Sequence, residues 1–319
     1  MLLSIGLIIL GFVLLIKGAD FLVEGSSNIA KKFHIPEIII GLTIVSIGTS
    51  MPELFVSTTS SINGYADMSI GNIIGSNLCN LLLILGLSAL IRPIKFQRET
   101  RLIEMPMCLI VTIIFMIFCN TSGSIQKSEA VVLIILFILF IIYTIVMAKK
   151  GEQFDKEDDV AETKTENKKI PIAKNIIFII LGIIGLKIGG DLTVDNALII
   201  ARQFNVSEKI IGLTILAIGT SLPELVTSVT AAIKGNSDIA IGNIIGSNIF
   251  NILFIIGVSA VISPLAYNFT YNIQMVILII AMLVLSLFPI IPPKNEMSRM
   301  NGAIYLILYA IYMAILFVV

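Results

Sequence analysis

The sequence contains GLTIVSIGTSMPELFVS at Gly41–Ser57 and repeats it as GLTILAIGTSLPELVTS at Gly212–Ser228, with identity at 12 of 17 positions. A second pair of segments has the same offset of 171 residues: GNIIGSNLCNLLLILG at Gly71–Gly86 and GNIIGSNIFNILFIIG at Gly242–Gly257, identical at 11 of 16 positions. One offset relates both pairs without a gap. The chain is therefore predicted to consist of two halves that arose by duplication.

The composition is that of a membrane protein. Of the 319 residues, 57% are hydrophobic and 13% are charged, and the mean hydropathy is +1.02. A soluble domain of this length cannot bury so much apolar surface. Apolar runs of about 20 residues, the length that spans a bilayer, recur along the chain. The first run, Leu2–Ile16, has no basic segment and no cleavage site, which predicts a membrane helix and not a removed signal peptide.

The apolar runs predict an all-α membrane protein with ten transmembrane helices in two inverted five-helix repeats. The predicted spans cover residues 2–30, 36–62, 68–91, 102–120, 129–148, 172–201, 207–233, 239–263, 269–291 and 300–319. Residues 1–148 form the first repeat, 149–171 a polar cytoplasmic linker, and 172–319 the second repeat. Because each half has an odd number of spans, the second half enters the membrane inverted. Secondary transporters use this plan and bind their substrates near the midplane.

Positive residues are distributed unevenly between the predicted loops. With the N-terminus outside, 16 of the 21 lysines and arginines lie in cytoplasmic loops, and only Lys127, Arg202 and Lys209 lie in outer loops. Cytoplasmic loops of membrane proteins carry the excess of positive residues. We therefore expect a multi-pass protein of the cell membrane with both termini extracytoplasmic. The formal net charge of zero argues against a nucleic-acid partner.

Two glutamates, Glu53 and Glu224, lie deepest in the predicted spans. A carboxylate in hydrocarbon costs at least ~2.5 kcal/mol, so each needs a partner or a function. Each follows a proline, Pro52 or Pro223, which lacks the N–H that would bond the carbonyl four residues earlier. The helix is predicted to kink or unwind there and to leave carbonyl oxygens unpaired, which is tolerated only inside protein or beside a cavity. Carbonyl and carboxylate oxygens together suit Na⁺ or Ca²⁺.

Polar side chains extend this predicted site along one face of each helix. The spacing i, i+3, i+4, i+7 marks one face, and it selects Ser46, Thr49, Ser50 and Glu53 in the first half, and Ala217, Thr220, Ser221 and Glu224 in the second. In the next span of each half, the spacing i, i+4, i+8 selects Asn72, Ser76 and Asn80, and Asn243, Ser247 and Asn251. These faces carry no sulfur or imidazole, so a zinc or copper site is not expected.

Other features of the spans have simpler interpretations. The motifs Gly71-x-x-x-Gly75 and Gly242-x-x-x-Gly246 favour close packing of helices. Asp20 and Asp191 occupy equivalent positions of the two halves. They are predicted either to lie near a mouth of the ion path or to pair with Lys17 and Lys187.

The repeated blocks G-x-x-x-x-[SA]-I-G-T-S-x-P-E and G-N-I-I-G-S-N-x-x-N resemble the α-repeats of the calcium/cation antiporter superfamily, specifically the prokaryotic sodium/calcium exchangers. The resemblance implies an antiporter that moves Ca²⁺ outward against inward Na⁺ by alternating access, with no cofactor besides the transported ions. It implies ion ligands at Thr49, Ser50, Glu53, Ser76, Asn80, Thr220, Ser221, Glu224, Ser247 and Asn251, and at the backbone carbonyls of Ser46 and Ala217.

Two positions depart from the pattern of that family. Its members often carry Asp where this chain has Asn251, and usually Ala where it has Ser46. The predicted site then holds two formal negative charges, enough to neutralise one Ca²⁺ or two Na⁺.

Other functions stay open on the sequence alone. Cation/proton antiport through the same glutamates is the main alternative, and a passive cation channel is another class. An intramembrane hydrolase is not expected, because Ser50 has no histidine near it in the sequence. We expect a transporter and not an enzyme, functional as a monomer in membrane lipid, with no separate calcium sensor in the linker.

Overall fold

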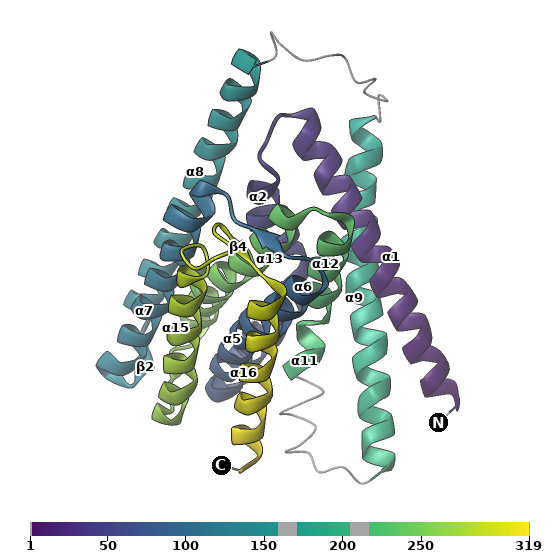
Figure 1. Cartoon of the computed structure of the whole chain (residues 1–319). Coiled ribbons are helices and arrows are strands. Elements are labelled where there is room, and N and C mark those ends of the chain that lie inside the picture. Colours follow the sequence, from purple (N-terminus) through teal and green to yellow (C-terminus); the bar gives the residue numbers. More distant parts are fainter. Residues whose placement is uncertain (1, 159–170, 205–216, 319) are drawn as a thin grey trace.

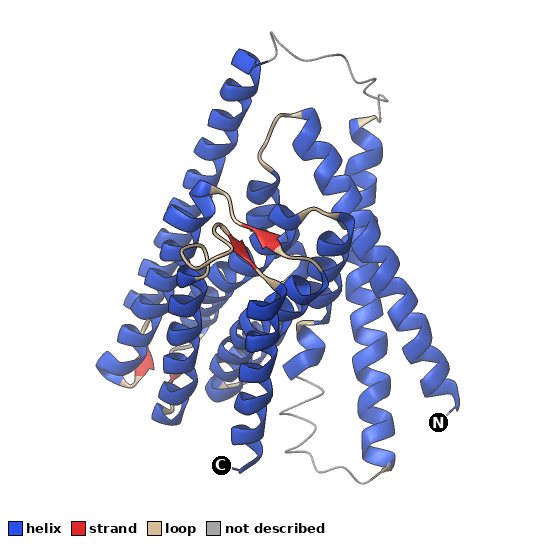
Figure 2. Ribbon diagram, viewed as in Figure 1, coloured by secondary structure: helices blue, strands red, loops and turns tan. Residues whose placement is uncertain are grey.

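A computed structural model describes residues 2–158, 171–204 and 217–318, and most of these residues are helical (Figure 1, Figure 2). Within these ranges seven helices are long and apolar enough to cross a membrane: Leu2–Lys32, Ala66–Ile91, Thr100–Ser122, Lys127–Lys149, Ile172–Ile200, Ser237–Ile262 and Phe269–Leu287. The helices Glu37–Thr49 and Met51–Ile62, which meet at 50°, add an eighth span if they are counted as one. The protein is therefore an all-helical membrane protein, as its composition predicts.

The two halves of the chain contain similar series of elements. The first half has α1 (Leu2–Lys32), α2 (Glu37–Ile40), η1 (Gly41–Val45), α3 (Ser46–Thr49), α4 (Met51–Ile62), α5 (Ala66–Leu78), η2 (Cys79–Ile84), α6 (Leu85–Ile91), β1 (Ile94–Lys95), η3 (Thr100–Glu104), α7 (Met105–Ser122), β2 (Ser124–Ile125) and α8 (Lys127–Asp158). The second half has α9 (Ile172–Gln203), α11 (Ala217–Thr220), α12 (Leu222–Lys234), α13 (Ser237–Phe250), η5 (Asn251–Ile256), α14 (Gly257–Ile262), β3 (Leu265–Ala266), η6 (Phe269–Tyr271), α15 (Asn272–Leu287), β4 (Glu296–Met297) and α16 (Arg299–Val318).

Two long helices, α1 and α9, lie side by side along one edge of the bundle (Figure 1). Glycines allow their backbones to touch. A methyl group added to Gly182 would lie 2.7 Å from the Leu22 nitrogen and 2.8 Å from the Gly18 carbonyl oxygen. A methyl group on Gly11 would lie 2.8 Å from the Gly189 carbonyl oxygen. These small residues therefore hold α1 and α9 together as one closely packed pair.

The helical segments α5–η2–α6 and α13–η5–α14 run through the centre of the molecule. In their most apolar windows 78% and 83% of the residues are buried, against 22% for α8. Apolar side chains on all sides of these central helices, such as Ile73, Leu78, Ile244 and Ile249, are fully buried. Because both their apolar and their polar side chains are buried, these helices lie inside other protein, and the repeated block G-N-I-I-G-S-N lies in the core.

Two short strand pairs join loops of the first half to loops of the second. β1 pairs antiparallel with β4, with Ile94 opposite Met297, and β2 pairs antiparallel with β3, with Ile125 opposite Leu265. Figure 2 shows the two pairs well separated along the bundle. Loops from both halves are therefore tied together at two separate levels of the bundle.

The structure refines several boundaries. α8 continues to Asp158, so the predicted linker, 149–171, begins as helix; residues 159–170 lie outside the described ranges, as do residues 207–216 of the seventh predicted span.

The predicted ion pair Lys187–Asp191 is present, with Nζ 2.8 Å from Oδ2. For Asp20, the alternative of a pair with Lys17 is wrong: its Oδ1 lies 2.9 Å from Nζ of Lys234 in α12, because tertiary packing brings that helix end to α1.

Candidate ion-binding site

Each half of the chain contains one broken helix beside its repeated proline. In the first half, α3 ends at Thr49, Ser50 has non-helical dihedral angles (φ −84°, ψ 12°), and α4 begins at Met51. In the second half, Ser221 separates α11 from α12 in the same way (φ −87°, ψ 7°). The predicted breaks are therefore confirmed.

Each break points the N-terminus of a helix towards the middle of the protein. Glu53 lies in the first turn of α4, and Glu224 lies in the first turn of α12. The partial positive charge at a helix N-terminus stabilises a carboxylate in its first turn. The break thus favours ionised glutamates even though both side chains are completely buried.

The serine of each break reaches the glutamate of the other half. The Ser50 hydroxyl donates a hydrogen bond to Oε1 of Glu224 at 2.7 Å, and the Ser221 hydroxyl donates one to Oε1 of Glu53 at 3.4 Å. Oε1 of Glu53 also accepts from Ser76 at 3.0 Å. The two broken helices therefore meet, and each contributes to the surroundings of both carboxylates.

Hydroxyl groups of the central helices complete these two clusters. Ser247 Oγ lies 2.9 Å from Ser50 Oγ, and Ser76 Oγ lies 3.0 Å from Ser221 Oγ. The two contacts are related by the 171-residue offset. Four predicted site serines and both predicted glutamates thus lie together, as the sequence pattern indicates.

The threonines of the breaks contact two asparagines of the central helices. Thr49 donates to Oδ1 of Asn243 at 3.1 Å, and Thr220 donates to Oδ1 of Asn72 at 3.5 Å. The amide nitrogens of these asparagines in turn donate to serines eight residues further along the broken helices, Asn72 to Ser57 at 3.1 Å and Asn243 to Ser228 at 2.9 Å. Asn72 and Asn243 therefore fasten the broken helices to the core.

The two predicted backbone ligands are the carbonyls of Ser46 and Ala217, and the structure describes more contacts for Ser46 than for Ala217. Ser46 Oγ donates to the carbonyl of Leu42 at 2.8 Å, so its hydroxyl bonds its own helix. The Ser46 carbonyl accepts from the Ser50 nitrogen at 3.0 Å and lies 3.3 Å from Thr49 Oγ1. Ala217 is the first residue of α11.

Four asparagine side chains form a hydrogen-bonded cluster between the two halves. Asn80 donates to Oδ1 of Asn248 at 3.1 Å, and Asn251 donates to Oδ1 of Asn77 at 3.0 Å. Asn80 and Asn251 were expected at the site, whereas Asn77 and Asn248 were missed. The sequence does indicate these two residues. Asn77 precedes Asn80 by three residues, a spacing that places both on the same helix face, and Asn248 and Asn251 have the same spacing.

Four buried oxygen atoms in this region have no hydrogen-bond partner among the described residues: Glu53 Oε2, Glu224 Oε2, Asn80 Oδ1 and Asn251 Oδ1. They form two pairs related by the repeat. Neither glutamate makes an ion pair with a described basic side chain. Unpartnered buried oxygens of this kind are costly and rare, and a carboxylate without a counter-charge is costlier still. Oε2 of Glu104 is unpartnered too, so it is the repeat relation of these four oxygens that makes them the candidate ligands of a desolvated cation.

The donor set also limits the type of cation. It offers two carboxylates, two carboxamide oxygens, hydroxyls and carbonyls, and no described group of three or more His, Cys, Asp or Glu side chains could hold a metal. Oxygen ligands suit Na⁺ and Ca²⁺, whereas zinc and copper sites use nitrogen and sulfur.

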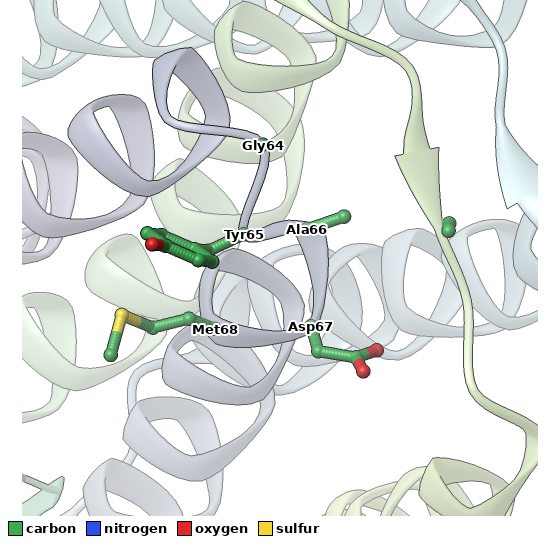
Figure 3. Close-up of a pocket in the computed structure, with 6 residues that line it drawn as sticks. Gly64, Tyr65, Ala66, Asp67 and Met68 are labelled. Atoms are coloured by element: carbon green, nitrogen blue, oxygen red, sulfur yellow. The ribbon is translucent and has the colours of Figure 1, made fainter.

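A surface pocket of about 460 Å³ lies apart from these residues (Figure 3). It is formed where α4 connects to α5, close to β3, and its lining residues are Gly64, Tyr65, Ala66, Asp67, Met68 and Ala266. The site residues do not line this pocket, and both glutamates are enclosed by protein.

Fold and site together define a multi-helix membrane protein with a buried, oxygen-rich candidate site for a cation. The family model described as "Sodium/calcium exchanger protein" matches residues 3–146 and again residues 174–318. The chain therefore belongs to the sodium/calcium exchanger family. It is a cation antiporter and not an enzyme.

Several individual proteins are similar over nearly the whole chain. The inner membrane protein YrbG of Escherichia coli is 37% identical over 288 residues, 88% of each chain. The sodium/calcium exchanger MaX1 of Methanosarcina acetivorans is 31% identical and covers 98% of this chain and 97% of its own length. A solved structure of the sodium-calcium exchanger NCX_Mj, soaked with 10 mM Na⁺ and 10 mM Sr²⁺, superposes with a TM-score of 0.84 at 35% identity over 98% of both chains.

Proposed function

We propose that this protein exchanges Ca²⁺ for Na⁺ across the membrane by alternating access. The observation that carries the proposal is the set of four unpartnered, buried oxygens at Glu53, Glu224, Asn80 and Asn251. Two carboxylates can neutralise one Ca²⁺ or two Na⁺, so either load leaves the site uncharged. The names of MaX1 and NCX_Mj as sodium/calcium exchangers support the same pair of ions.

The ion ligands in this proposal belong to both halves. The carboxylates of Glu53 and Glu224 supply the charge, and neutral oxygens complete the shells. The proposed neutral ligands are the side chains of Thr49, Ser50, Ser76, Asn80, Thr220, Ser221, Ser247 and Asn251, and the carbonyls of Ser46 and Ala217. Na⁺ and Ca²⁺ occupy overlapping positions among these atoms and so compete.

The coupling ion can be tested in vesicles that contain the purified protein. Labelled Ca²⁺ uptake is measured while an outward Na⁺ gradient, K⁺ gradient or H⁺ gradient is imposed in turn. We expect the Na⁺ gradient alone to drive accumulation. Accumulation driven by the pH gradient without Na⁺ would instead support cation/proton antiport through the same glutamates, and equilibration without any gradient would support a channel.

The same proposal includes ten membrane spans in two inverted five-helix repeats, 1–148 and 172–319, around a cytoplasmic linker at 149–171. Beyond the eight spans described above, α16 and the broken α11–α12 pair supply the ninth and tenth. The strand pairs β1–β4 and β2–β3 support this count, because ten spans put each pair on one side of the membrane. The double match of the family model supports the repeat.

The proposed orientation rests on the uneven distribution of positive residues between the loops. We place both termini outside the cell membrane, and the protein works as a monomer whose outer helices face lipid. Exposed apolar side chains along α8, such as Ile135, Ile138 and Ile142, are consistent with lipid contact.

This orientation predicts a labelling pattern on intact cells. A membrane-impermeant maleimide is expected to label a Lys127→Cys variant directly, and a Lys95→Cys variant only after permeabilisation. Both positions are exposed, whereas the native Cys79, Cys108 and Cys119 are buried and give little background. The reverse pattern would place the termini in the cytoplasm.

A further inference from the structure

Asparagine ligands pose a problem that carboxylate ligands do not. A carboxamide has an oxygen on one side and an NH₂ group of similar shape on the other, and only the oxygen attracts a cation. Rotation by half a turn exchanges the two. Asn80 and Asn251 are completely buried, so water does not decide which side faces the site. Some other group has to fix their orientation.

The other two asparagines of the cluster, Asn77 and Asn248, supply that group. The NH₂ of Asn251 donates to Oδ1 of Asn77, and the NH₂ of Asn80 donates to Oδ1 of Asn248. If either ligand amide rotated, its oxygen would face another oxygen, which is repulsive. With the amides as they stand, the oxygens of Asn80 and Asn251 are the atoms left without a partner.

Asn77 and Asn248 are themselves held by the backbone. Asn77 donates its NH₂ to the carbonyl of Asn248 at 3.3 Å, and Asn248 donates its NH₂ to the carbonyl of Asn77 at 3.3 Å. A backbone carbonyl can only accept, so it allows one orientation of each amide. That orientation presents Oδ1 to the ligand asparagine of the other half. A backbone carbonyl therefore fixes the orientation of the Asn77 or Asn248 amide, and that amide fixes the orientation of the ligand amide.

We propose that Asn77 and Asn248 are positioning residues that aim the carboxamide oxygens of Asn251 and Asn80 at the transported cation. The proposal rests on the proposed function, because it assumes that those two oxygens bind the ion. Each half thereby sets a ligand of the other half: Asn77 acts only through Asn251, and Asn248 acts only through Asn80.

A pair of double-mutant cycles tests this assignment. Ca²⁺ binding to the purified protein and Na⁺-driven Ca²⁺ uptake in vesicles are measured for Asn77→Ala, Asn251→Ala and Asn80→Ala, and for the double variants. Asn77→Ala is expected to weaken Ca²⁺ binding about tenfold, the usual order for losing one buried hydrogen bond. Added to Asn251→Ala it is expected to have little further effect, since its target is gone. When Asn77→Ala is added to Asn80→Ala, the two losses of Ca²⁺ affinity are expected to multiply, because the two residues act independently.

The matched control comes from the repeat. Asn248→Ala is expected to show the opposite dependence: no further effect with Asn80→Ala, and a multiplied loss with Asn251→Ala. If the asparagine cluster were purely structural, Asn77→Ala and Asn248→Ala would weaken binding equally in every background, and that result overturns the proposal. If Asn77→Ala does not fold, the Asn248 cycle carries the test. Failure of both single variants to fold overturns the proposal too, since the pair would then be structural.

Transport by the unmodified protein distinguishes a failure of this proposal from a failure of the proposed function. If it shows no Na⁺-driven Ca²⁺ uptake, sodium/calcium exchange is refuted. If uptake is normal but the effects of Asn77→Ala and Asn251→Ala are independent, exchange stands and only the positioning role is refuted.

Discussion

Replacing either Glu53 or Glu224 by glutamine is expected to lower Na⁺-driven Ca²⁺ uptake at least about 100-fold. Each substitution removes half of the negative charge available to a cation that has lost its water, and leaves the other carboxylate in the site. One of the two positive charges of Ca²⁺ then has no neutralising carboxylate. Uptake of labelled Ca²⁺ into vesicles with an outward Na⁺ gradient measures the effect.

Glutamine keeps the shape and the hydrogen bonds of the original side chain. A Glu224→Gln protein still offers Oε1 to the Ser50 hydroxyl, so its melting temperature without added ions is expected to stay close to that of the unmodified protein. Loss of uptake with an unchanged fold therefore reports the charge. Near-normal uptake by either variant would contradict the assignment of the site.

Glu104→Gln is the matched control for these substitutions. Glu104 is also fully buried, and its Oε1 accepts a hydrogen bond from Tyr143 at 2.6 Å, which a glutamine oxygen can keep. It lies in η3, outside the two clusters around the breaks. Uptake by Glu104→Gln is expected to remain within about twofold of the unmodified rate. A large loss there would mean that any buried glutamate in the spans is essential.

Much of the candidate site can be predicted from two repeated blocks. Glu53 and Glu224 are conspicuous because a buried carboxylate is costly, and the prolines before them predict the break that the structure has at Ser50 and Ser221. Serine and threonine positions follow from helical spacing within each half. These inferences succeed because they depend only on residues close together in the sequence.

The contacts between the halves are less accessible to sequence reasoning. A stripe of residues four apart selects Asn72, Ser76 and Asn80 but omits Asn77, whose partners are Asn248 and Asn251 in the other half. The helix also changes to a wider π-helical turn at Cys79, which shifts the faces that a regular spacing assumes. Asp20 illustrates the same limit, because its partner Lys234 is more than 200 residues away.

The charge of the site leads to the second prediction with a large expected effect, for Asn251→Asp. With two carboxylates, a load of one Ca²⁺ or two Na⁺ leaves no net charge. A third carboxylate would sit among Glu53 and Glu224 in a region without a described basic partner, and like charges in a buried site repel strongly. It would also place an oxygen opposite Oδ1 of Asn77, where the amide of Asn251 now donates.

Without added cations, the Asn251→Asp protein is therefore expected to melt roughly 5 °C below the unmodified protein. Ca²⁺ is expected to raise its melting temperature by more than it raises that of the unmodified protein, because the cation now relieves repulsion among three carboxylates. Asn63→Asp makes the same chemical change at an exposed position and is expected to alter neither value measurably. An Asn251→Asp protein that melts normally without cations and gains no extra stabilisation from Ca²⁺ would mean that Asn251 does not lie with the glutamates around the ion. Thermal unfolding of the three purified proteins, with and without Ca²⁺, thus tests the location of the charge independently of transport.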